Sequence, residues 1–158
     1  MTVGTNTYVT LEEADTYIGV RGTKDECDRW VSLESSEKQA FLLDACDEIE
    51  ALPLIGQKLN VDQLLAFPRL QRYRLREETI PQKVKNAQIE LALWLSDTDK
   101  QADFQQRTNL QAQGVDSFSI GDLSESYSAG ASDNPAPLLC PKCRMLLKPY
   151  TEGSFLTC

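Results

Sequence analysis

The sequence contains no histidine, which removes the side chain that most often serves as a general acid or base and as a metal ligand. It also lacks the glycine-rich patterns that bind phosphates and the Gly-x-Ser-x-Gly pattern of serine hydrolases. Paired acidic residues occur, but without histidine or a glycine-rich loop they are interpreted as solvated helix faces. We therefore predict a protein that is not an enzyme, has no catalytic residue and needs no cofactor.

Long apolar runs and an excess of basic residues are missing too. No stretch approaches the roughly 18–20 apolar residues that cross a bilayer, and the first residues have neither the basic region nor the apolar core of a secretory signal. The net charge is −8, opposite to that of a general nucleic-acid binder. Five cysteines without a secretion signal indicate a reducing compartment. We expect one compact protein without a membrane partner.

Helical patterns dominate the N-terminal part of the chain. Thr10 and Glu13 fit a capping box, which predicts a helix that ends near Gly22. Residues 25–33 predict a short helical segment that places Trp30 in the core.

One proline follows the end of a longer predicted helix, and another lies at the start of the next. Pro53 follows a helix expected from about residue 37 to residue 51, with Ser36 beginning a second capping-box pattern. Pro81 suits the first turn of a helix over residues 81–96. Apolar positions in this last helix are spread so widely that we expect it to be covered on more than one side.

Basic residues gather around a charged connector that follows Pro68. The apolar run 61–67 before it predicts one or two helical turns. Tyr73 lies between two arginines, the one place where an aromatic residue is set among basic ones. Two interpretations stay open: a solvated surface paired with nearby glutamates, or a DNA-facing basic cluster. The cluster consists of Arg69, Arg72, Arg74 and Arg76.

The pattern changes after residue 97. Residues 115–120 and 123–127 alternate apolar with polar side chains, which predicts a β-hairpin. A linker rich in serine, glycine and proline follows, and residues 139–150 predict a short amphipathic helix. The predicted fold is mainly α: a small helical bundle (residues 1–97), then an extended hairpin, linker and C-terminal helix and tail used in assembly (residues 98–158).

Cys140-Pro141-Lys142-Cys143 matches half of a zinc ribbon. A structural zinc needs four ligands, however, and the other cysteines are isolated. A metal site at Cys140 and Cys143 is therefore the weaker alternative, and a thioredoxin-like role would need a βαβ pattern that is absent. The favoured interpretation makes Cys140 a helix N-cap, Pro141 part of the first turn and Cys143 a small buried apolar residue.

Three ordered segments resemble the head–tail connector, or adaptor, proteins of tailed bacteriophages. They are Tyr8-Val9-x-Leu11-Glu12-Glu13-Ala14-Asp15-x-Tyr17, Ala66-Phe67-Pro68-Arg69 and Ile80-Pro81-x-x-Val84-Lys85-x-Ala87-x-x-Glu90-Leu91-Ala92. The resemblance runs from about residue 7 to residue 150, and many members carry the label of a DnaT-like single-stranded-DNA-binding protein. The paired cysteines and the tail with Phe155 depart from the family pattern.

The resemblance implies a structural role in the virion. Such adaptors form a homo-oligomeric ring, typically of twelve subunits, beneath the phage portal protein. The ring extends the channel for double-stranded DNA and docks the next neck or tail protein. The protein would lie in the host cytoplasm before assembly and at the head–tail junction afterwards. Two alternatives remain: a single-stranded-DNA-binding replication accessory, and a zinc-stabilised interaction protein.

The C-terminal region also raises the question of what covers its apolar side chains. A short helix and a lone hairpin are marginally stable in water. The chain's own bundle could cover them, or a neighbouring subunit or the portal could, and for the tail beyond Pro149 we expect the latter. The expected interface residues are Leu146, Leu147, Tyr150, Phe155, Phe118 and Ile120.

Overall fold

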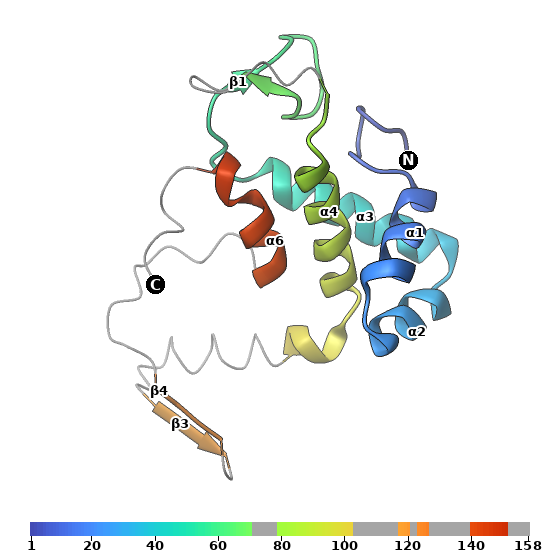
Figure 1. Ribbon diagram of the computed structural model, residues 1–158, viewed down its shortest axis with the longest axis vertical. Coiled ribbons are helices and arrows are strands. Elements are labelled where there is room, and N and C mark those ends of the chain that lie inside the picture. The colour runs from blue at the N-terminus through green and yellow to red at the C-terminus, as the bar shows by residue number, and fades with distance from the viewer. Residues whose placement is uncertain (71–78, 103–116, 121–122, 127–139, 152–158) are drawn as a thin grey trace.

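The structure is a computed structural model that describes residues 1–70, 79–102, 117–120, 123–126 and 140–151. It is mainly helical, which confirms the predicted fold class (Figure 1). The helices are α1 (Leu11–Arg21), α2 (Lys24–Ser32), α3 (Ser35–Glu50), α4 (Gln82–Leu95), α6 (Pro141–Leu147) and the 3-10 helix η1 (Lys148–Tyr150). The strands are β1 (Gln57–Lys58), β2 (Arg69–Leu70), β3 (Ser117–Ile120) and β4 (Leu123–Ser126).

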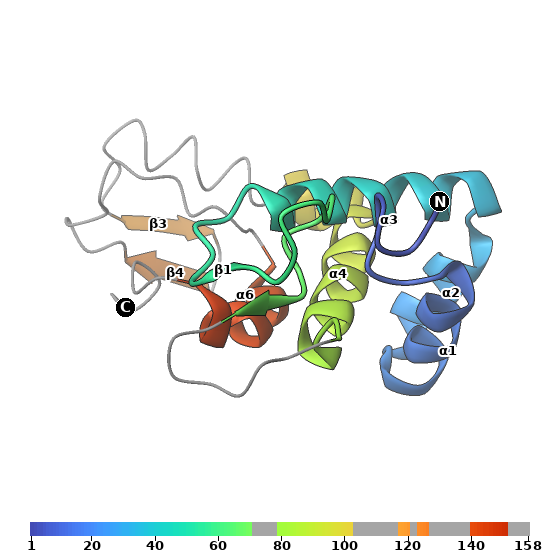
Figure 2. The same ribbon diagram turned by 90° about the horizontal axis from the view of Figure 1, so that it is seen from above.

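Helix α4 is the centre of the bundle. It packs against α3 and α6, and α1 also contacts it. Figure 2 shows α6 on one side of α4 and α1 on the other, with α3 running across both. The expected coverage on more than one side is thus confirmed, and the covering helices belong to the same chain. Its buried residues are Val84, Ala87, Gln88, Ile89, Glu90, Leu91, Ala92 and Leu93.

One buried amide joins the N-terminal segment to two helices. Gln88 Oε1 accepts the backbone N–H of Tyr8 at 2.9 Å, while Nε2 donates to Thr7 Oγ1 at 2.8 Å and to the Leu42 carbonyl at 2.6 Å. Each of these groups lies in the interior, where an unpaired polar atom is costly. Gln88 therefore fixes the start of the chain against α3 and α4.

Capping boxes set the starts of the first two helices. The predicted box at Thr10 and Glu13 is confirmed, with reciprocal hydrogen bonds of 2.9 and 3.1 Å. Thr23 and Glu26 form a second box that begins α2. This second box follows the same Thr-x-x-Glu spacing, so the sequence pattern contained it although the prediction did not use it.

The starts of α3 and α4 differ from the prediction. Helix α3 begins at Ser35, and the carboxylate of Glu37 accepts the N–H of Glu34 at 2.8 Å, so the capping box expected at Ser36 is wrong. Pro81 stands just before α4 as its N-cap residue, with φ −61° and ψ 138°. A proline suits either place because the first helical N–H groups have no partner inside the helix.

The helical turns expected over residues 61–67 are not formed. These residues belong to a loop that joins β1 to β2, which pair antiparallel with Lys58 opposite Arg69. The loop's polar side chains bind its own backbone, which competes with helix formation. Its apolar end, with Phe67, enters the core.

The predicted C-terminal hairpin and short helix are both present. Strands β3 and β4 form an antiparallel hairpin with Phe118 opposite Glu125 and Ile120 opposite Leu123. Helix α6 and η1 follow, and α6 packs on α4 as part of the bundle. In the part of the chain that the structure describes, no helix has the length and apolarity needed to span a membrane.

Leu91→Asp tests the central position of α4. Leu91 is fully buried, so an aspartate there would place an unpaired carboxylate in the core and should cost several kcal/mol of unfolding free energy. Chemical denaturation measures this loss. The matched control is Met145→Asp, since Met145 is 75% exposed on α6 and should change stability by about 0.5 kcal/mol or less. Equal stability of the two variants would contradict the central role of α4.

Candidate functional site

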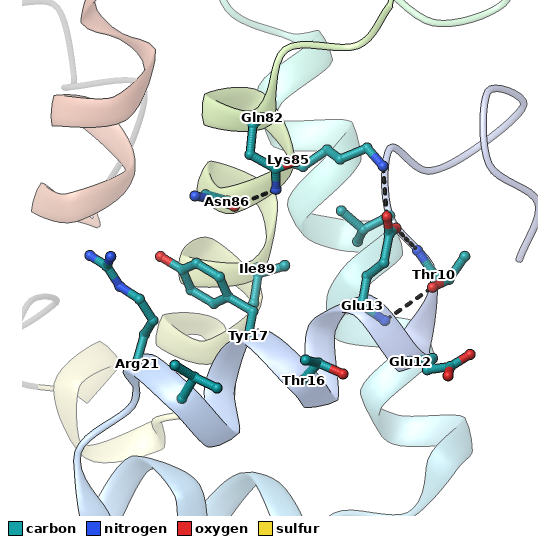
Figure 3. A pocket seen from close by; sticks show the side chains of 12 residues that line it. Thr10, Glu12, Glu13, Thr16, Tyr17, Arg21, Gln82, Lys85, Asn86 and Ile89 are labelled. Carbon is teal, nitrogen blue, oxygen red and sulfur yellow. Dashed lines mark hydrogen bonds and ion pairs between the residues drawn. The ribbon is translucent and has the colours of Figure 1, made fainter.

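An open groove lies between α1 and α4 and has a volume of about 480 Å³ (Figure 3). This volume is within the usual range of ligand sites. The apolar part of its lining comes from Val9, Val20 and Ile89, and Tyr17 adds an aromatic ring. Its other lining residues carry hydroxyl, amide or charged groups: Thr10, Glu12, Glu13, Thr16, Arg21, Gln82, Lys85 and Asn86.

An ion pair lies at one end of the groove. Lys85 Nζ lies 2.7 Å from Glu13 Oε1, which joins the start of α1 to α4 (Figure 3). Partial burial acts to raise the pKa of the Glu13 carboxyl, but hydrogen bonds from Lys85 and Thr10 outweigh it and hold the pKa below its ordinary value. Glu13 and Lys85 therefore have partners within the chain.

The other end presents a guanidinium group beside an aromatic ring. Arg21 Cζ lies 5.9 Å from the centre of the Tyr17 ring, within cation–π range. The Tyr17 hydroxyl donates a 3.0 Å hydrogen bond to Glu90 Oε1. Burial, followed by the nearby Glu90 carboxylate, raises the pKa of Tyr17 to about 12. This end combines apolar surface with an exposed cation.

Glu90 extends the same network to the C-terminal helix. Its second oxygen lies 3.3 Å from Lys142 Nζ, so one mostly buried carboxylate bonds to α1 on one side and α6 on the other. A smaller cavity of about 330 Å³, whose lining includes Glu90, Trp94 and Cys140, lies beside it. The sequence prediction missed both cavities, because they depend on how distant helices pack.

The two cysteines of the C-P-x-C pattern lie as the favoured interpretation expected. Cys140 is the N-cap of α6, and its Sγ accepts the N–H of Cys143 at 3.5 Å. Both side chains are buried, and burial raises the pKa of each thiol above its ordinary value. The protonated thiol is neither a good nucleophile nor a metal ligand. Among the described residues, no three His, Cys, Asp or Glu side chains gather as a metal site would require.

Arg69, the first member of the predicted basic cluster, has a structural role. Its guanidinium donates to the carbonyl oxygens of Ile55 at 3.0 Å and Leu54 at 3.1 Å, and it also binds that of Gly56. Its hydrogen-bonding groups are thus directed at the backbone of residues 54–56, so Arg69 fits neither the solvated surface nor the DNA-facing cluster. The rest of the cluster, Arg72, Arg74 and Arg76, lies outside the described residues.

Two of the predicted interface residues are core residues of the same chain. Leu147 and Tyr150 are buried, and the Tyr150 ring meets Phe67 edge to face at 5.3 Å. The Tyr150 carbonyl accepts the N–H of Ile55 at 2.8 Å. The bundle itself covers them. Of the predicted interface residues on α6 and η1, Leu146 is the one that is partly exposed. Phe118 and Ile120 lie on β3, and Phe155 falls outside the described residues.

A family model with the description "Putative DnaT-like ssDNA binding protein" matches residues 1–157. The chain belongs to this family. The match spans the groove, the β1–β2 loop and α6 alike. Comparison with curated proteins gave no match, and comparison with solved structures gave none either. The family's description agrees with the second hypothesis from the sequence, single-stranded-DNA binding.

Tyr17→Phe tests the bond between Tyr17 and Glu90 in this DnaT-like family member. A folded-state pKa raised to about 12 means that the folded protein keeps the phenol proton after the unfolded chain loses it near pH 10. Stability from this group is therefore complete below pH 10 and is lost as the pH rises toward 12. Between pH 9 and 11, melting temperature should fall more for the wild type than for Tyr17→Phe. Parallel pH profiles of the two proteins would contradict the bond.

Tyr150→Ala tests whether the C-terminal 3-10 helix belongs to the core. Removing this buried ring should lower the unfolding free energy by about 3 kcal/mol, because a cavity is left beside Phe67. Urea denaturation measures the change. Lys148→Ala is the control, since Lys148 is exposed on the same short helix. An unchanged midpoint for Tyr150→Ala would return this residue to the set of interface candidates.

Proposed function

We propose that this protein is a structural head–tail connector of a tailed phage, without catalytic activity. In this role it forms a homo-oligomeric ring at the head–tail junction of the virion, binds the portal protein on one face and the next neck or tail protein on the other, and lets double-stranded DNA pass. The three ordered segments of the sequence support the proposal. The structural observation that carries it is where the described aromatic and basic side chains lie.

Four large aromatic side chains of the described residues are buried and cannot stack on bases. Tyr8, Trp30, Phe67 and Tyr150 all lie in the core. Binding of single strands uses exposed aromatic rings on which successive bases stack. These four rings therefore stabilise the bundle and are not available for stacking.

Many basic side chains are committed to acidic partners within the chain. Lys85 and Lys38 pair with residues of α1, Lys142 and Lys100 pair with Glu26 of α2, and Arg29 lies 3.0 Å from Asp97. An arginine or lysine that is already paired releases fewer counterions on binding phosphate. Together with a net charge of −8, this pairing suits a conduit that DNA crosses without adhering.

The β3–β4 hairpin supports assembly as the mode of action. It forms a sheet of two strands, and a sheet this small is marginally stable alone in water. Among the described residues no third strand pairs with it, so its edges can accept a further strand from another protein. A ring subunit has such a neighbour on each side.

Single-stranded-DNA binding is the second candidate, and the family description favours it directly. Tyr17 with Arg21 at the groove is the pair that could serve it, because one base could stack on the ring while the guanidinium meets a phosphate. The second candidate requires that binding of single-stranded DNA depends on these residues, and the connector does not.

Electron microscopy and sedimentation of the purified protein, with and without the phage portal protein, test the connector. We expect rings, or stoichiometric co-sedimentation with the portal. In parallel, fluorescence anisotropy with a labelled single-stranded oligonucleotide should show weak binding that is equal for Arg21→Ala and the control Lys24→Ala, an exposed cation on α2. Tight, salt-sensitive binding that Arg21→Ala alone weakens, with no ring and no portal complex, would favour the second candidate.

A further inference from the structure

The loop between β1 and β2, residues 59–68, is built to be rigid. Lys58 Nζ donates to the carbonyl oxygens of Gln63 at 3.1 Å and Leu64 at 3.0 Å. Gln63 Oε1 accepts the N–H of Asn60, and its Nε2 donates to the carbonyl oxygens of Leu65 and Pro68. Side chains thus replace the backbone pairing that a regular element would supply.

The far end of this loop is held in the core. The N–H of Ala66 donates to both carboxylate oxygens of Glu50, at 2.8 and 3.0 Å, and Glu50 also accepts the Tyr8 hydroxyl. Phe67 packs edge to face against Tyr8 at 5.8 Å. The loop therefore has a fixed position on the bundle as well as a fixed internal shape.

Apolar side chains at the tip of this loop are exposed to solvent. Val61 is 93% exposed and Leu64 is 64% exposed, with the acidic Asp62 between them and also exposed. Ordering a loop before binding removes an entropic cost from association. A rigid loop that holds apolar side chains in water therefore has the properties of a docking element.

The groove between α1 and α4 has the complementary properties. Its apolar surface is mainly that of Val20, which is 79% exposed, above the buried side chains of Val9 and Ile89, and Arg21 stands at one end. The Arg21 cation thus matches the anion of the loop tip, while Glu12 and the Glu13–Lys85 pair lie at the opposite end of the groove (Figure 3). Figure 2 shows β1, which leads into the loop, on one side of α4 and α1, which lines the groove, on the other.

We propose that the loop tip of one copy inserts into the α1–α4 groove of a second copy. Val61 and Leu64 then meet the apolar lining, and the Asp62 carboxylate pairs with the Arg21 guanidinium. Because two different surfaces meet, the contact is head to tail, and repetition of it closes a ring when the rotation per subunit allows. This inference rests on the proposed ring and assigns its subunit contact.

Charge reversal tests the contact. Asp62→Lys and Arg21→Glu should each weaken self-association of the full chain at least tenfold, measured by analytical ultracentrifugation. A mixture of the two variants should recover it, because alternating copies place the introduced lysine against the introduced glutamate and leave the native pair at the next contact. Leu64→Asp should also weaken association, with no partner that restores it. Val31→Asp, on the exposed face of α2, is the control and should associate as the wild type does.

Melting curves confirm that each variant is folded before its association is compared. Failure of the mixture to recover association would overturn the proposal, as would a wild type that stays monomeric at all concentrations. If both variants associate normally and still bind the portal, the connector stands and its subunit contact lies elsewhere. If the variants lose self-association but the wild type does not bind the portal, the contact stands and the connector does not.

Discussion

The structure depends on one buried amide at the middle of α4. Gln88 satisfies donors and acceptors from the N-terminal segment and from α3, in an interior where a missing partner would leave several polar groups unpaired at once. A leucine of similar size would fill the space but would leave the Tyr8 N–H without an acceptor. The amide therefore fixes how α1, which follows directly, lies across α4, and the groove between them takes its width from that arrangement.

Most of the fold could be predicted from short-range sequence patterns. The capping box at Thr10, the long helix that Pro81 precedes, the β3–β4 hairpin and the N-cap role of Cys140 all follow from short-range patterns, and each is present. The apolar run 61–67 suggested helical turns, but the structure has a loop there. There the bonds from Lys58 and Gln63 to the loop backbone decide the conformation.

The candidate site was less accessible to sequence reasoning. An amphipathic face shows that Tyr150 and Leu147 must be covered, but it does not show which element covers them. Here α6 packs on α4, and Phe67 of the β1–β2 loop meets the Tyr150 ring. The groove is formed by residues about seventy positions apart, such as Glu13 and Lys85. The periodicity of either helix does not predict that these residues come into contact. Arg69 belongs to a basic cluster that suggested a DNA contact, but its guanidinium donates hydrogen bonds to the backbone carbonyls of Ile55 and Leu54.

Because α6 packs on α4, the order in which the ribosome makes these two helices matters for folding. Leu95 ends α4 and Cys140 begins the segment that covers it, 45 positions later. At about 5–20 residues per second, a ribosome needs several seconds to make that interval. During this time one apolar side of α4 has no cover from its own chain. A growing chain should therefore be most exposed to chaperones, and to wrong partners, after the first four helices are made and before α6 emerges.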